Sequence, residues 1–184
     1  MNIFYVHADP IIAAEMHCDK HVVKMIVEAA QMLSTAHRIV DGNKVIGKSK
    51  TGRKKTDWLL SDSLMESVLY KTVHMNHPST VWTRESLQNY VWHYQLFAAL
   101  CEEYKFRYGK EHATFQKLDS VLKNPPKNIP NLGFTPVKLA MKSNPECMFP
   151  DDPLKSYRMF YQTKQGRFKM TWTKRDVPYW FIRK

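Results

Sequence analysis

An apolar segment that carries a polar residue at every third or fourth position dominates the first quarter of the chain. The segment begins with CDKHVVKMIVEAAQML at residues 18 to 33. Its regularly spaced polar residues are His21, Lys24, Glu28, Gln31, Thr35 and Arg38. This spacing matches the helical repeat, so the sequence predicts one helix from residue 20 to about residue 40. The DG pair at residues 41 and 42 predicts where it ends.

The polar residues of this helix form a stripe, and the stripe can face either solvent or a cleft. At 100° per residue they fall within an arc of about 100°, and the apolar residues cover more than about 200°. The simplest interpretation is a solvated face. An apolar arc this wide instead favours a stripe that lines a cleft. Glu28 beside Lys24 in a cleft is a pair suited to acid–base chemistry. His37, on the apolar side, is predicted to be a hydrogen-bonded core histidine.

Other helix signals recur along the chain. Asp9–Pro10 and Asp152–Pro153 each pair a capping carboxylate with a proline at the first helical position. Further helices are expected near residues 10–17, 61–74, 87–108, 112–124 and 153–164. Residues 2–6, NIFYV, fit a short strand or an extended arm. We therefore predict an all-α fold: a single compact helical domain over residues 1–184, with a long central helix and a short extended N-terminal arm.

Basic residues outnumber acidic residues, and the excess of positive charge indicates the class of partner. The chain has 28 Lys and Arg against 17 Asp and Glu, a formal net charge of +11. This excess favours a polyanion, DNA or a nucleotide, as the partner. Residues 41–57 hold six basic residues and three glycines, which predicts a basic mobile loop.

Several functional classes find no support in the sequence. No secretory signal or membrane-length apolar run is present, so we expect a cytoplasmic protein (in the host cytoplasm if it is viral) with no membrane partner. No phosphate-binding loop, dinucleotide fingerprint or serine-hydrolase motif occurs, so no cofactor is predicted. His17 and His21 could belong to a zinc site, but no second pair of ligands completes it, and no metal is predicted. The oligomeric state stays open.

Some stretches resemble known proteins. NHPSTVWTRESLQNY, EEYKFRYGKEH and DDPLKSYRMFYQTK look like blocks of a little-characterised phage and bacterial family. The chain also distantly resembles the pyrimidine-dimer DNA glycosylase/lyase called endonuclease V, an all-α phage repair enzyme. The catalytic helix of that enzyme has Asp, then His two residues later and the catalytic Glu nine residues after the Asp. Asp19, His21 and Glu28 have this spacing. A Tyr-Lys-Tyr-Tyr-x-Lys pattern near its C-terminus resembles Tyr157, Arg158, Phe160, Tyr161 and Lys164.

The resemblance implies a DNA-binding enzyme that cleaves the glycosidic bond of a damaged or modified pyrimidine. Such an enzyme needs an amine to attack C1′ and a carboxylate to stabilise the cationic sugar and move protons. The relative uses the amine exposed by removal of its initiator Met. Here Asn2 is too large for efficient removal, so Met1 would supply the amine, with Lys24 as a substitute. The predicted catalytic residues are Glu28, His21, Lys24 and Met1.

The predicted nucleic-acid contacts are cations, amides and one ring near the stripe, the long helix and the C-terminal helix. They are Gln31, Arg38, Arg84, Asn89, Arg107, Lys110, Tyr157, Arg158 and Lys164. Aromatic residues between cations can stack a flipped base and hold phosphates. Two alternatives stay open: a non-catalytic phage-type protein that binds or sequesters a nucleotide, such as a host defence signal, and a small inhibitory protein that docks an acidic host protein.

Overall fold

The computed structural model describes residues 1–48 and 51–183. Within these ranges the chain is mostly helical, with 51% of residues in helix, seven α-helices and one two-stranded sheet. The helices are α1 (Pro10–Glu15), α2 (Asp19–Asp41), α3 (Ser63–Val68), α4 (Pro78–Glu85), α5 (Leu87–Tyr108), α6 (Ala113–Leu122) and α7 (Pro153–Gln162). Short 3-10 turns, η1 (Pro145–Cys147) and η2 (Thr163–Gly166), flank α7.

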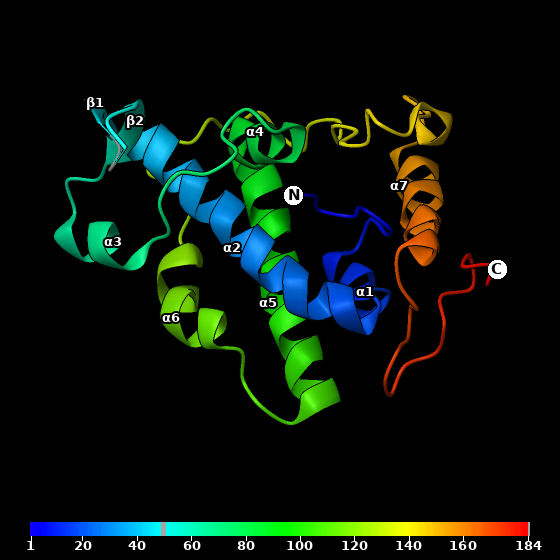
Figure 1. Ribbon diagram of the computed structural model, residues 1–184. Helices are drawn as coiled ribbons and strands as arrows, with labels where there is room; N and C mark the ends of the chain where they lie inside the picture. The colour runs from blue at the N-terminus through cyan, green and yellow to red at the C-terminus, as the bar shows by residue number, and fades with distance from the viewer. Residues whose placement is uncertain (49–50, 184) are drawn as a thin grey trace.

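The two long helices, α2 and α5, cross at the centre of the molecule (Figure 1). Helix α2 also packs against α4 and α6, and α1 packs against α5. The predicted central helix is therefore confirmed. The predicted cap at Asp9 is confirmed too, because its side chain accepts hydrogen bonds from the N–H groups of Ile11 and Ile12. Asp152 accepts one from the N–H of Lys155.

The prediction of a mobile loop at residues 41–57 is wrong for the part that the structure describes. Strands β1 (Asn43–Lys48) and β2 (Lys54–Leu59) form an antiparallel hairpin, so the fold is not all-α. The β-branched Val45 and Ile46 favour extended backbone, which outweighs the basic, glycine-rich composition of this segment. Residues 49 and 50 of the predicted loop lie outside the described residues.

The helix expected at residues 61–74 is shorter than predicted and is α3. The chain leaves helical geometry at Leu69, the C-cap of α3. From there, the carbonyl groups of Leu69 and Tyr70 accept hydrogen bonds from the buried Arg38 guanidinium. Arg38 of α2 thus supplies hydrogen bonds to carbonyl groups that would accept from backbone N–H groups in a longer helix.

The N-terminal segment, residues 2–6, is an extended arm, one of the two predicted options. It passes between α2 and α7 (Figure 1), and Ile3 and Val6 are fully buried. The Phe4 ring stacks on His21, with ring centroids 4.7 Å apart, and meets Tyr161 edge-on at 5.0 Å. The Asn2 amide donates to the carbonyl of Ala140 at 3.1 Å. The arm is therefore an integral part of the core.

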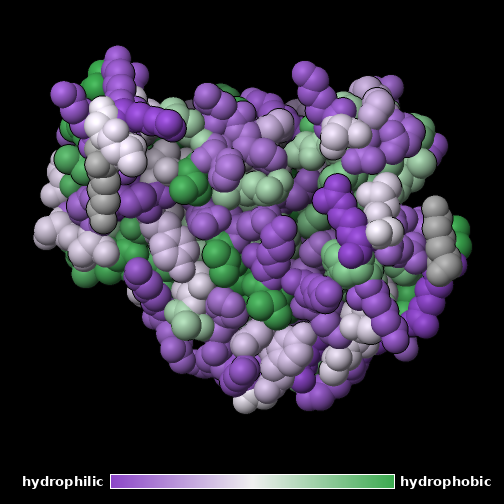
Figure 2. Space-filling model, viewed as in Figure 1, coloured by the Kyte–Doolittle hydropathy of each residue, from purple (hydrophilic) through white to green (hydrophobic). Residues whose placement is uncertain are grey.

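One hydrophobic core cluster takes residues from both ends of the chain, from Ile3 to Phe181. Hydrophilic residues cover most of the outer face in Figure 2. All three cysteines, Cys18, Cys101 and Cys147, are free and buried. No helix within the described ranges is long and apolar enough to cross a membrane.

The core also holds four histidines that burial keeps neutral. Burial lowers the pKa of His17 and His37 to about 4, and the pKa of His21 and His93 to about 3. His37 Nε2 lies 2.8 Å from the Tyr90 hydroxyl, which confirms the predicted hydrogen-bonded core histidine.

His93 gives a testable pH dependence. Its folded-state pKa of about 3 lies below the ordinary value of 6.5. The resulting stabilisation is therefore complete above pH 6.5 and is lost as the pH falls toward 3. Between these values His93 binds one proton on unfolding, which lowers the unfolding free energy by about 1.4 kcal/mol per pH unit. His93→Gln should reduce the slope by that amount in urea unfolding between pH 6 and 4. An unchanged slope would contradict a neutral, buried His93.

Candidate active site

The first three residues of the polar stripe of α2, His21, Lys24 and Glu28, line a cavity of about 340 Å³ beneath the N-terminal arm. We call this cavity the amine–carboxylate pocket. Its lining residues are Met1, Asn2, Phe4, His21, Lys24, Glu28, Ala140, Phe160, Lys164, Arg167 and Phe168. They come from the arm, from α2, from the segment before η1, and from α7 and the chain that follows it. All four predicted catalytic residues are among them.

Among the described residues that line the pocket, Glu28 is the only one with a carboxylate. Its side chain is 14% exposed. One oxygen, Oε2, accepts a hydrogen bond from the N–H of Asn2 at 3.0 Å and lies 3.7 Å from the N-terminal nitrogen of Met1. The other, Oε1, lies 3.2 Å from Lys24 Nζ. The expectation that Glu28 is mostly buried, beside Lys24 and in a pocket is therefore confirmed in its geometry. Its catalytic role stays a prediction.

A third amine, that of Lys164, lies in the opposite wall of the pocket. Lys164 follows α7, is 7% exposed, and has its Nζ 3.4 Å from the centroid of the Phe160 ring. Burial, and then the charge of Arg167, lower the pKa of Lys164 to about 8. At neutral pH a useful fraction of this amine is thus unprotonated, as a nucleophile requires. The sequence placed Lys164 among the phosphate contacts and did not reveal this property.

His21 lines the pocket as a neutral imidazole, and its predicted catalytic role stays a prediction. Burial, and then the charges of His17 and Lys24, lower its pKa to about 3, so the ring is neutral at physiological pH. Its Nδ1 is buried and has no hydrogen-bond partner within residues 1–48 and 51–183.

The prediction that Arg38 contacts nucleic acid is wrong, because its guanidinium is completely buried. The Nε group donates to the carbonyl of Tyr70 at 2.7 Å. Nη1 donates to the carbonyl of Trp58 at 2.9 Å and to Glu66 Oε2 at 2.6 Å. Nη2 donates to the carbonyls of Glu66 and Leu69 at 3.0 and 3.1 Å. All five donors are used, so Arg38 joins α2 to the hairpin and α3.

Three further predicted contacts are also wrong, because each side chain is buried and hydrogen-bonded within the protein. The Asn89 amide donates to the carbonyl of Trp82 at 2.9 Å. The Tyr157 hydroxyl donates to the carbonyl of Lys138 at 2.7 Å. Arg107 is 3% exposed and donates to Glu103 at 2.6 Å. All three side chains stabilise the fold, and a phosphate cannot reach them.

Asp19 belongs to the same buried network as Arg107 and does not line the pocket. Its Oδ1 accepts from Arg107 at 2.8 Å, and its Oδ2 accepts from the hydroxyls of Thr171 and Thr173 at 2.8 and 2.9 Å. The Asp19–His21–Glu28 spacing therefore brings only its last two members to the pocket. Asp19 instead anchors the C-terminal segment to the start of α2.

The remaining predicted contacts lie outside the pocket lining. Gln31 is half-buried on α2, and Lys110 is exposed just beyond α5. Arg84 donates to the carbonyl of Thr80 at 3.0 Å. Arg158 donates to the carbonyl of Val6 at 2.9 Å, with its guanidinium 5.4 Å from the centroid of the Tyr179 ring. Their binding roles stay predictions.

Sequence reasoning missed several residues that line the pocket. Asn2 and Phe4 have no local pattern that distinguishes them from an ordinary apolar arm. Arg167 and Phe168 do carry a signal, because KQGRFK at residues 164–169 places a ring among cations. The sequence does not show what this segment contacts, because the pocket residues of α2, His21, Lys24 and Glu28, precede it by more than 130 residues.

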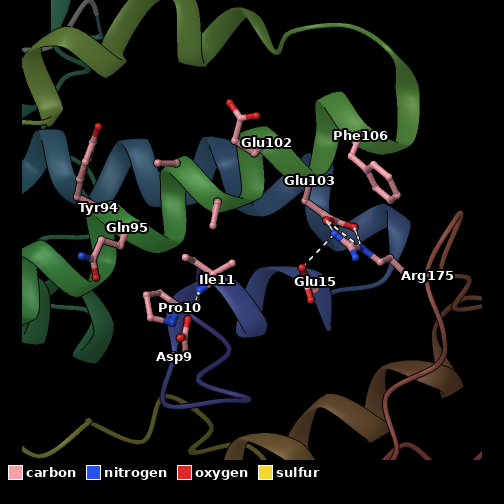
Figure 3. Close-up of a pocket in the computed structure, with 12 residues that line it drawn as sticks. Asp9, Pro10, Ile11, Glu15, Tyr94, Gln95, Glu102, Glu103, Phe106 and Arg175 are labelled. Atoms are coloured by element: carbon pink, nitrogen blue, oxygen red, sulfur yellow. Dashed lines mark hydrogen bonds and ion pairs between the residues drawn. The ribbon is translucent and has the colours of Figure 1, made fainter.

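A larger cavity, of about 650 Å³, lies between α1, α5 and the C-terminal segment (Figure 3). Its charged groups are mostly paired. Arg175 binds Glu103 at 2.9 Å and Glu15 at 3.1 Å, and Glu103 also accepts from Arg107. No amine faces a carboxylate among its lining residues, since its one cation is an arginine. The amine–carboxylate pocket is therefore the stronger candidate for chemistry.

Within the described ranges, no group of three or more His, Cys, Asp or Glu side chains is placed to hold a metal ion. No family model matches this chain, and neither a curated protein nor a solved structure matches it. The resemblance to endonuclease V therefore stays a prediction, and the geometry of the pocket carries the functional argument.

Proposed function

We propose that the protein is a DNA glycosylase/AP lyase that acts on a damaged or modified pyrimidine. One observation carries the proposal: the N-terminal nitrogen of Met1 lies 3.7 Å from Glu28 Oε2 at a pocket. An amine beside a mostly buried carboxylate is the pair that glycosidic-bond cleavage through a Schiff base requires.

In the proposed reaction the Met1 nitrogen attacks C1′ of the target nucleotide. A bond forms between this nitrogen and C1′, and the glycosidic bond breaks with its electron pair leaving on the base, which takes up a proton. The carboxylate of Glu28 accepts the proton lost by the amine and stabilises the cationic sugar. The sugar ring then opens: the lone pair of the bound nitrogen forms the C1′=N bond while the C1′–O4′ bond breaks, and O4′ takes up a proton. Loss of the C2′ proton from this protonated imine expels the 3′ phosphate and breaks the strand.

The surroundings of the pair support a nucleotide as the substrate. Lys24, Lys164 and Arg167 supply positive charge that attracts phosphate, and Phe160 and Phe168 supply ring surfaces. The neutral imidazole of His21 also lines the pocket.

The test is borohydride trapping on duplex oligonucleotides that contain an abasic site or a pyrimidine lesion. Borohydride reduces the imine to a stable secondary amine, so a covalent protein–DNA adduct is expected. Peptide mapping of the adduct should find the modified residue at Met1. One extra residue before Met1 displaces the amine and should abolish the adduct.

The lysine variants Lys24→Gln and Lys164→Gln identify the nucleophile independently. If Met1 attacks, both variants should still form the adduct. Loss of the adduct in Lys164→Gln alone would assign the attack to the lysine whose pKa is about 8. No adduct with any abasic or lesion substrate would contradict the proposal.

A second candidate is a protein that binds a nucleotide in the same pocket without catalysis. It is favoured by the three cations, Lys24, Lys164 and Arg167, which gather around two rings and would hold a phosphate without a reaction. Calorimetric titration with mononucleotides and cyclic oligonucleotides separates the two. Tight binding of one of these ligands, with no trapped adduct, would favour this candidate.

A further inference from the structure

The amine–carboxylate pocket has a neighbouring cavity of about 410 Å³, which we call the second pocket. It lies in the C-terminal part of the chain, and its lining includes Phe168, Lys169, Thr171, Phe181 and Arg183. Phe168 lines both pockets. One half-buried aromatic ring thus separates two adjoining cavities.

The position of this ring is fixed from the α2 side. The ammonium of Lys20 lies 4.8 Å from the Phe168 ring centroid, and His21 meets the ring edge-on with centroids 5.4 Å apart. Cation–π and aromatic contacts of this kind hold a ring in place. Phe168 is therefore a fixed boundary between the pockets, with part of its surface open to a ligand.

The charges that line the two pockets are of one sign, apart from Glu28. Lys164 and Arg167 lie in the first pocket, and Lys169 and Arg183 in the second. None of these four forms an ion pair with a residue that the structure describes. Their charges are thus available to a ligand, unlike that of Arg175 in the larger cavity.

We infer that the two pockets form one path for a nucleic-acid strand of at least two nucleotides. The target nucleotide occupies the amine–carboxylate pocket, and this placement rests on the proposed function. The next nucleotide crosses Phe168, and its phosphate lies between Lys169 and Arg183. Repeated charges beside a ring match the repeated phosphates and bases of a strand. A mononucleotide would occupy only one of the two pockets.

Fluorescence anisotropy with a labelled single-stranded oligodeoxythymidylate of about eight nucleotides tests the path, since this length matches known single-strand site sizes. The double variant Lys169→Gln/Arg183→Gln should weaken binding at least about 10-fold at low salt. It should also reduce the log–log salt slope by about 1.4, because two phosphate contacts are lost. Phe168→Leu should weaken binding by about 5-fold or more, through lost stacking.

The matched control is Lys123→Gln/Lys127→Gln, which removes two exposed lysines near the end of α6. It should change the affinity less than about 2-fold, which separates local contacts from net charge. Circular dichroism checks that each variant is folded.

The two proposals fail in different ways. Wild-type protein that does not bind the oligonucleotide, or a double variant that binds as tightly as the control, would overturn the strand path. Strand binding with the predicted variant effects, but without a borohydride adduct, would overturn the lyase and retain the path. If the wild type and the Lys169→Gln/Arg183→Gln variant gave the same yield of adduct on long and on short substrates, the lyase would be retained and the path overturned.

Discussion

Glu28→Gln should lower the rate of adduct formation on abasic DNA by about 10²-fold or more. The substitution keeps the volume of the side chain but removes the carboxylate. That carboxylate takes up the proton lost by the amine, and its charge stabilises the cationic sugar. Gln still offers a carbonyl oxygen to the N–H of Asn2, which donates to Glu28 at 3.0 Å. The arm should therefore stay in place. Single-turnover borohydride trapping measures the rate.

The stability of this variant decides how the rate is interpreted. The ion pair between Glu28 and the exposed Lys24 contributes little, but the buried Met1 ammonium also loses its counter-charge. The free energy of unfolding should therefore fall by about 1–2 kcal/mol, which leaves the protein folded. Glu102→Gln, on the exposed side of α5, makes the same chemical change outside the pocket and should leave the rate unaltered. A Glu28→Gln protein that is stable and reacts at the wild-type rate would contradict the catalytic role.

Arg38→Met should lower the free energy of unfolding by about 3–5 kcal/mol, the largest stability effect that we expect. Removing the buried guanidinium leaves Glu66 and the carbonyls of Trp58, Leu69 and Tyr70 without donors that they use in the folded protein. Lys71 still pairs with Glu66, so the loss comes mainly from the buried acceptors that are left unsatisfied, each at about 1–3 kcal/mol. Urea unfolding measures the loss.

Lys71→Met is the matched control for this variant. Lys71 forms an ion pair with the same carboxylate, that of Glu66, but its side chain is 54% exposed. An exposed ion pair contributes little, so this change should cost less than about 1 kcal/mol. Similar losses for Arg38→Met and Lys71→Met would show that burial of the Arg38 guanidinium has no special effect.

The helical periodicity of residues 18–40 was sufficient to predict α2 and to single out Glu28. It worked because the wide apolar arc of the helix already implied that the stripe would be covered. The same stripe included Arg38, whose role could not be predicted from its helix. Its acceptors lie in β2, in α3 and in the segment after α3, none of which is marked by a pattern around residue 38.

The hairpin shows a different limit of sequence reasoning. Lysine and glycine are common in loops, and they outnumber Val45 and Ile46 in residues 41–57. Pairing between β1 and β2 stabilises the strands, and this stabilisation depends on the residues of both segments, not on either segment alone. Local composition therefore predicted a loop where the paired structure is a hairpin.

The parts of the chain that form the walls of the amine–carboxylate pocket also determine when the pocket can form during synthesis. Its walls come from the arm at residues 1–4 and from the chain at residues 160–168. The ribosome makes Glu28 long before it makes the segment after α7, so the growing chain holds one wall of the pocket without the opposite wall. The pocket can close only once residues 160–168 have been made, by a contact between distant segments whose loop closure is slow. Chains that stop before residue 160 should therefore lack the pocket.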